Sequence, residues 1–182
     1  MHEYPSILSI KSTKLRRRPE QMRERTCCFT GHRDIPVDQL QMVMANTETK
    51  VRELISQGYR YFGVGGAVGY DTIVAEMLFR LREREYPGIK IILMYPFDGF
   101  TGRWSDSQKT TYARLLPLYN KRVCVCKSPS REAYLERDRH LVDCSSVCVA
   151  YCTRQTGGTA YTIRYAAARG VPVFNVGDIL RH

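Results

Sequence analysis

Residues 65–71 read GGAVGYD, and this stretch decides the fold. It lies between an apolar run rich in β-forming residues at 59–64 and an amphipathic run that begins at Thr72. A strand, a glycine turn and a helix N-terminus in this order favour an anion site, because glycines let the backbone approach a phosphate and the first helical N–H groups point at it. A second glycine turn, TGGT at residues 156–159, lies near the other end of the chain. Together the two turns predict a nucleotide-type ligand held from two sides.

Strand-like and helix-like runs alternate on both sides of this stretch. Apolar runs predict strands at 26–30, 59–64, 89–95, 122–126, 147–151 and 171–176. Helical spacing of apolar residues predicts helices at 37–57, 71–85, 105–116, 131–143 and 159–169. Ser105 is the predicted N-cap of the third helix, and Pro172 favours an edge position for the last strand. The alternation predicts an α/β fold of the Rossmann-like, doubly wound kind, with a mainly parallel sheet of about six strands and helices on both faces.

Composition and charge limit the class of protein. The chain has 182 residues, of which 43% are hydrophobic and 25% charged, as expected for a globular domain. We expect one domain at 25–182 behind a basic, poorly ordered tail at 1–24. The formal charge is +10, and the tail segment KLRRR at 14–18 would either contact a nucleic acid or remain solvated. No apolar run has the length of a membrane span or of a signal peptide, so we expect a cytoplasmic protein without a membrane partner.

Seven cysteines are present, and most lie in apolar, strand-like runs. We expect them to pack as small hydrophobic side chains rather than to form disulfides. The residues assigned to the core on this basis are Cys27, Cys28, Cys124, Cys126 and Cys148. Cys144, Cys148 and Cys152 are evenly spaced, but they lack the paired CxxC spacing of a zinc site. We therefore predict no metal centre.

The carboxyl ends of parallel strands meet at one edge of a sheet, and most of the candidate residues follow such ends. The predicted ligand-binding residues are Thr30, Gly31, His32, Arg33, Gly65, Gly66, Ala67, Gly69, Asp71, Pro96, Phe97, Trp104, Arg139, Gly157, Gly158 and Thr159. Several have structural alternatives. Asp71 and Thr159 would also serve as helix caps, Trp104 would also pack in the core, and Arg139 would also pair with Asp143 at a spacing of i, i+4.

At these residues the chain resembles the SLOG superfamily, which joins the DNA-processing protein DprA with the lonely-guy cytokinin-activating enzymes, and within it the YpsA-like group. The likeness runs from about Thr26 to Val176. It rests on the order and spacing of TGHR at 30–33, the GGAVGYD turn, Pro96-Phe97 with Trp104, Arg137-x-Arg139-x-x-Val142-Asp143, and Gly157-Gly158-Thr159-x-x-Thr162. The resemblance implies a bacterial Rossmann-like domain that binds nucleotides or nucleotide-derived ligands, often as a sensor. Such relatives often associate, and the sequence leaves a monomer and a homodimer open.

The chain departs from the superfamily at informative positions. Lonely-guy enzymes carry a glutamate three residues after the threonine of their glycine turn, and Thr162 stands there in this chain. The candidates for acid–base work are therefore His32, Asp71 and Asp143. YpsA-like loops often have a glutamine where this chain has Phe100.

Three functions follow as hypotheses. The first is binding of a nucleotide or an NAD- or ADP-ribose-type ligand, with no further cofactor assigned. The second is a nucleoside or nucleotide hydrolase of the phosphoribohydrolase kind. The third is a binder of single-stranded DNA in the manner of DprA, using the basic tail and body.

Overall fold

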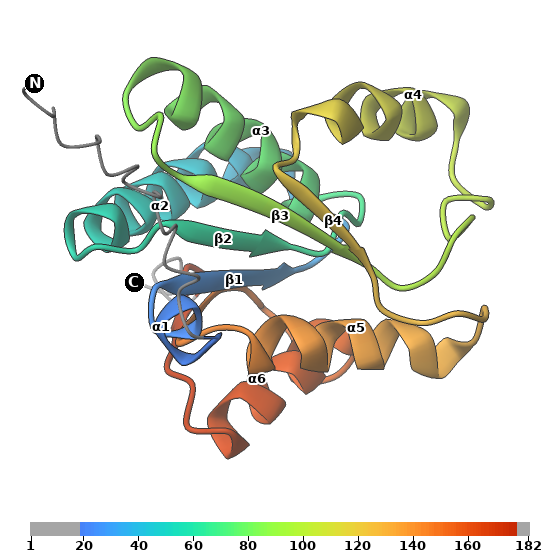
Figure 1. Ribbon diagram of the computed structural model, residues 1–182. Coiled ribbons are helices and arrows are strands. Elements are labelled where there is room, and N and C mark those ends of the chain that lie inside the picture. The colour runs from blue at the N-terminus through green and yellow to red at the C-terminus, as the bar shows by residue number, and fades with distance from the viewer. Residues whose placement is uncertain (1–18, 178–182) are drawn as a thin grey trace, which may run out of the picture.

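The computed structural model describes residues 19–177, which form helices and strands in strict alternation after the first helix (Figure 1). In chain order the elements are α1 (Pro19–Arg23), β1 (Thr26–Gly31), α2 (Val37–Ser56), β2 (Tyr61–Val64), α3 (Tyr70–Arg84), β3 (Lys90–Tyr95), α4 (Asp106–Leu115), the 3-10 turn η1 (Leu116–Leu118), β4 (Lys121–Cys124), α5 (Arg131–Asp143), β5 (Val147–Tyr151), α6 (Gly158–Ala168) and β6 (Val173–Asn175).

All pairings in the sheet are parallel, and its strand order is β4-β3-β2-β1-β5-β6. The chain therefore adds strands in one direction from β1 to β4 and then returns to the other side of β1 with β5. This reversal is a topological switch point between β1 and β5, the place where such sheets bind ligands. The predicted α/β fold class, with six parallel strands, is confirmed.

Helices cover both faces of the sheet (Figure 1). Helices α2, α3 and α4 lie on one face, while α5 and α6 lie on the other. The larger core lies under α2 and α3 and includes the fully buried Phe62, Tyr70 and Leu78. A smaller core under α5 and α6 joins Cys28 of β1 to Leu141 of α5. The central strands are thus apolar on both sides, as the continuous apolar runs predict.

The helix ends follow local signals in the sequence. Ser105 caps α4 in a capping box with Gln108, as predicted, and Ser130 caps α5 by accepting a hydrogen bond from the backbone N–H of Ala133 at 2.9 Å. Gly58 follows α2 with a φ of 98°, a left-handed conformation that glycine adopts at low cost. Pro172 precedes β6, which is an edge strand, as predicted.

The structure differs from the sequence expectations in the N-terminal tail and at Cys124. Residues 19–23 of the expected tail form α1, and the Arg23 side chain donates a hydrogen bond to the carbonyl of Asp143 at 3.1 Å. The rest of that tail, with its KLRRR segment, lies outside the described residues. The prediction of a core position for Cys124 is wrong, because β4 is the other edge strand and this residue is exposed on it. Of the helices between residues 19 and 177, none combines the length and the apolar character that crossing a bilayer requires.

Candidate functional site

A cleft of about 370 Å³ opens at the switch point, beyond the carboxyl ends of β1 and β5. Its walls come from residues 30–34 after β1, the turn before α3, the inner face of α5 and the loop at 154–159 before α6. We call it the switch-point cleft. Residues of both glycine turns contribute to its walls.

The turn before α6 is the open one. Gly157 is the N-cap of α6, has a φ of 94°, and makes no side-chain capping bond. A Cβ atom at either Gly157 or Gly158 would meet nothing within 4 Å, so the backbone here is bare toward the cleft. The first N–H with an intrahelical partner is that of Tyr161, which donates to the Gly157 carbonyl at 3.0 Å. Within residues 19–177, the earlier N–H groups of α6 have no hydrogen-bond partner, so they are available as donors for an anion in the cleft that Gly158 and Thr159 line.

The turn before α3 is closed instead. The Ala67 N–H donates to the Asp71 carboxylate at 3.1 Å, and the Tyr70 N–H donates to the His32 carbonyl at 3.1 Å. Gly69 has a φ of 81°, and a Cβ atom there would strike the backbone of Arg33. Glycine is thus required at position 69, because the loop between β1 and α2 passes close to it. The N–H groups of Ala67 and Tyr70 are thus used inside the protein.

Of this turn, only Ala67 and Asp71 line the cleft. Gly65 and Gly66 lie behind it. The Gly65 carbonyl accepts a hydrogen bond from the Arg137 guanidinium, and a Cβ atom at Gly66 would strike Leu93. Gly65 and Gly66, which the sequence predicts as ligand-binding residues, are therefore not among the residues that line the cleft.

A buried pair of opposite charges forms the floor of the cleft. Asp71 and Arg137 are both buried, and both line the cavity. Arg137 is held by Asp138, whose carboxylate accepts its Nε–H at 2.7 Å, and by the Gly65 carbonyl. Burial raises the pKa of Asp71 to about 6, although the nearby Arg137 guanidinium acts in the opposite direction. A cleft carboxylate with such a pKa can change protonation near neutral pH, which is typical of functional sites.

His32 connects two walls of the cleft. Its Nε2 accepts a hydrogen bond from the Thr153 N–H at 2.9 Å, and its ring packs edge-on against Tyr151. Burial lowers the pKa of His32, and the nearby Arg154 adds to this effect. The imidazole is therefore a neutral acceptor that fixes the loop before α6. Thr30, Gly31 and Arg33 also line the cleft, and Gly31 leaves room for the Tyr70 ring.

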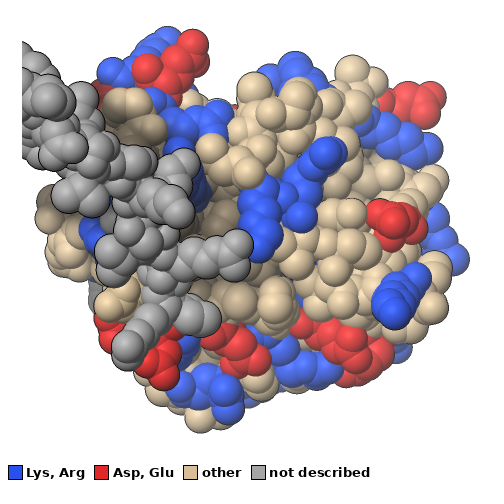
Figure 2. All heavy atoms as spheres, in the orientation of Figure 1, with Lys and Arg blue, Asp and Glu red and all other residues tan. Residues whose placement is uncertain are grey.

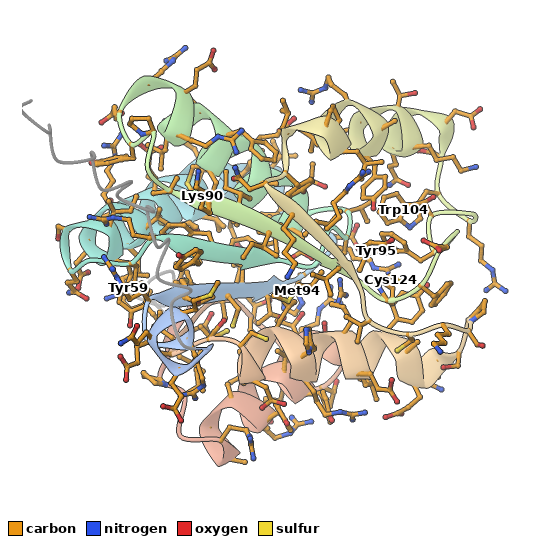
Figure 3. The ribbon with its side chains drawn as sticks, viewed as in Figure 1. Tyr59, Lys90, Met94, Tyr95, Trp104 and Cys124 are labelled. Carbon is orange, nitrogen blue, oxygen red and sulfur yellow. The ribbon has the colours of Figure 1, made fainter. Side chains whose placement is uncertain are left out.

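A second, larger hollow of about 840 Å³ adjoins the cleft, and Arg33 and Tyr134 line both. We call it the aromatic groove. Its principal lining residues are Arg33, Phe97, Arg103, Trp104, Arg131 and Tyr134. Figure 3 shows Trp104 below α4, on the side of the sheet where Tyr95 and Cys124 end their paired strands. Phe97 and Trp104 thus belong to the groove, whereas Pro96 is buried and its carbonyl accepts the Cys126 N–H.

The structure places Arg139 and Asp143 outside the cleft. Arg139 donates hydrogen bonds to the Tyr161 hydroxyl on α6 at 2.8 Å and to Glu132 on its own helix at 2.6 Å. Asp143 accepts hydrogen bonds from Tyr165 and Arg169, so the two residues do not pair with each other. Figure 2 shows acidic and basic side chains mixed along the lower rim, which α5 and α6 form in Figure 1. Neither of these predicted site residues is therefore among the residues that line the cleft.

The sequence prediction also missed residues that line the cleft. Arg137 follows Ala133 and precedes Leu141 at helical spacing, so the buried face of α5 contains it, and this periodicity could have identified it. Arg154 lies three residues before the glycine turn and is exposed at the mouth of the cleft. Thr159 lines the cleft inside α6 rather than capping it. Thr162 is buried, and its hydroxyl donates to the Gly158 carbonyl at 2.9 Å.

Cysteines do not assemble a metal centre in the part of the chain that the structure describes. Between residues 19 and 177, no group of three or more His, Cys, Asp or Glu side chains is placed so that it could hold a metal ion. Cys148 is buried beside β1, Cys152 Sγ donates to the Arg154 carbonyl at 3.1 Å, and Cys144 lies near His140.

Comparison with known proteins gives consistent results. The model of the YspA SLOG family matches residues 27–170. A UPF0398 protein of Shouchella clausii is 29% identical over 124 residues, which cover 66% of each chain. A UPF0398 protein of Oceanobacillus iheyensis is 27% identical over 142 residues, which cover 75% of this chain and 76% of the relative.

Two solved structures share the fold. DNA processing protein A from Helicobacter pylori, described for its single-stranded DNA binding mode, has a TM-score of 0.59 at 18% identity and covers 90% of this chain and 74% of its own. DNA processing protein A from Streptococcus pneumoniae has a TM-score of 0.59 at 13% identity, over 86% of this chain and 51% of its own. The chain thus spans about half the length of the second protein.

Proposed function

The chain belongs to the YspA SLOG family, and we propose that it binds a nucleotide or a nucleotide-derived ligand in the switch-point cleft. One observation carries the proposal. The bare glycine turn before α6 presents unused backbone N–H groups to a cavity at the switch point of a parallel sheet.

The phosphate of the ligand would bind at this turn. The N–H groups of Gly158 and Thr159 supply oriented donors, and the helix dipole of α6 adds positive potential at the same place. Arg154 and Arg33, both exposed at the cleft, supply guanidinium groups that suit phosphate oxygens. We place the phosphate there rather than at the turn before α3, where the N–H groups of Ala67 and Tyr70 already have partners inside the protein.

The sugar of the ligand would lie toward the floor of the cleft. Thr30 offers a hydroxyl there, and Asp71 offers carboxylate oxygens, of which Oδ2 already accepts the Ala67 N–H. Above about pH 6 the carboxylate is ionised, and an ionised carboxylate accepts hydrogen bonds from sugar hydroxyls without donating any. Asp71 is therefore the proposed partner of the ribose, with Arg137 as the group that balances its charge.

Binding without turnover fits these residues best. The position that carries the glutamate in lonely-guy enzymes is Thr162, which is buried and bonded within its helix. His32 is occupied as an acceptor, and Asp143 lies outside the cleft. Of the two carboxylates among the acid–base candidates, Asp71 lines the cleft and Asp143 does not. Release of free adenine from AMP would therefore indicate a hydrolase that uses Asp71 instead.

A panel of AMP, ADP, ADP-ribose and NAD tests the proposal. Isothermal titration at ligand concentrations up to ~1 mM should detect at least one of them, and the bound ligand should raise the melting temperature by mass action. The matched variants are Gly158→Pro, which removes an N–H at the turn, and Gly88→Pro, at an exposed loop where a Cβ atom meets nothing within 4 Å. Binding should be lost only in the first. Absence of binding for the whole panel would contradict the proposal.

A second candidate function is binding of single-stranded DNA. It is favoured by the structural likeness to DNA processing protein A from Helicobacter pylori, whose described property is such binding, and by the formal charge of +10. Phosphate-dominated binding falls steeply as salt rises. Affinity for an oligothymidylate that falls with salt and survives Gly158→Pro would support a surface track, whereas loss in that variant would support the cleft.

A further inference from the structure

The aromatic groove has the composition of a second nucleotide subsite. Phe97 and Tyr134 line it with rings whose centroids are 5.5 Å apart at 81°, and Trp104 also lines it. Trp104 packs edge-on against Phe100 and Tyr112, so both neighbours hold its plane in place. Fixed aromatic faces beside a cavity suit the stacking of a nucleobase.

The charge of the groove points to phosphate. Arg33, Arg103 and Arg131 line it and are exposed, and none of the three forms an ion pair with another described residue. The carboxylate among its described lining residues is Asp98, which accepts a hydrogen bond from the Tyr95 hydroxyl at 3.0 Å. Three unpaired guanidinium groups against one bonded carboxylate leave the groove with an excess of positive charge suited to bidentate oxyanions.

The groove and the cleft are neighbours that share two lining residues. Arg33 and Tyr134 line both hollows, and their volumes are about 370 and 840 Å³. Arg33 follows β1 directly, where the loop is fixed by the bond from the Tyr70 N–H to the His32 carbonyl. The backbone of Arg33 is therefore fixed between the two subsites. Its guanidinium is placed to bind a phosphate that joins two nucleotide units.

We propose that the ligand contains two nucleotide units joined through phosphate, with the second unit in the aromatic groove. This inference rests on the proposed function, which places the first unit in the switch-point cleft. The second base would stack against Trp104 and Tyr134, and the linking phosphate would lie between Arg33, Arg103 and Arg131. A 5′–5′ dinucleotide and a short single strand share this chemistry.

Three adenine probes test the inference on the full chain: AMP, the strand fragment pApA and the dinucleotide NAD. At least one two-unit probe should bind about ten-fold tighter than AMP, the gain expected when one base stacks on an aromatic ring. The double variant Arg103→Gln/Arg131→Gln, which removes two proposed partners of the linking phosphate, should reduce this gain and leave AMP affinity within about two-fold of the parent. A preference for pApA would identify a strand as the source, and a preference for NAD would identify a dinucleotide.

The matched control is Lys121→Gln/Arg84→Gln, which removes two exposed positive charges near the amino ends of the strands, away from the groove. It should retain the full gain. Trp104→Phe keeps an aromatic ring and the loop packing, and should keep most of the gain. Equal affinity for AMP and both two-unit probes would overturn the inference and leave the proposed function standing. Absence of binding for all three probes would overturn both.

Discussion

Asp71→Asn should stabilise the protein at neutral pH, although it alters the most buried carboxylate of the cleft. Burial raises the pKa of Asp71 from its ordinary value of 3.8 to about 6. The native state therefore binds more protons than the unfolded state between about pH 4 and pH 6. The stability associated with the protonated carboxyl is fully present below about pH 4, falls as the pH rises through this window, and stays low above about pH 6.

The magnitude follows from the size of the shift. A difference of about two pKa units corresponds to about 3 kcal/mol, because one unit is worth about 1.4 kcal/mol. Asparagine resembles the protonated acid and still offers an oxygen to the Ala67 N–H, which Asp71 accepts at 3.1 Å. The variant should thus gain up to about 3 kcal/mol above pH 7 and almost nothing near pH 4.

Urea denaturation at several values between about pH 4 and pH 8 measures this difference directly. Asp143→Asn is the control, since Asp143 is partly exposed and bonded to Tyr165 and Arg169, and this variant should be no more stable than the parent. A difference between Asp71→Asn and the parent that does not grow with pH, or a variant less stable than the parent at about pH 8, would refute the reasoning. A carboxylate kept at such a cost inside a cleft is expected where function requires its charge.

Four further outcomes follow from the geometry. Gly69→Ala should lose about 2–3 kcal/mol in urea denaturation, because its φ is 81° and its Cβ would strike the backbone of Arg33; an unchanged midpoint would contradict this. Gly157→Ala, at a φ of 94° but in open space, should cost only about 1–2 kcal/mol and weaken AMP binding by titration; equal affinity would count against the turn as the phosphate site. Arg139→Gln should leave AMP affinity within about two-fold, since this side chain is bonded to Glu132; a larger loss would place it in the site. Cys124, exposed on an edge strand, should react with a thiol reagent in the native protein, and mass spectrometry showing it unmodified would contradict its placement.

The fold was largely predictable, because its signals are local. The run at 147–151 is apolar throughout and became β5, and the helical spacing at 131–143 gave α5 with the same bounds. Cys124 shows where such reasoning ends. An apolar residue in a β-forming run is buried only if neighbouring elements cover both faces of its strand. The strand order places β4 at an edge of the sheet, and the sequence of residues 122–126 alone does not predict that order.

The site was predictable in outline and not in detail. The sequence identified both glycine turns, but it could not show that the His32 carbonyl and the Asp71 carboxylate accept hydrogen bonds from two N–H groups of the first turn. These contacts join residues far apart in the chain, so no local pattern encodes them. The choice of Arg139 over Arg137 is different, because the spacing of Arg137 from Ala133 and Leu141 marks it as the inward-facing arginine.

The turn before α6 is the centre of this account, and backbone NMR tests it most directly. In a titration of the ¹⁵N-labelled protein with AMP, the amide signals of Gly158, Thr159 and Ala160 should show the largest shifts, since their N–H groups would bond to the phosphate. The amides of Ala67 and Tyr70 should move little, because they already have partners. Saturable binding that moves the amides of the first turn and leaves those of α6 unchanged would contradict the account.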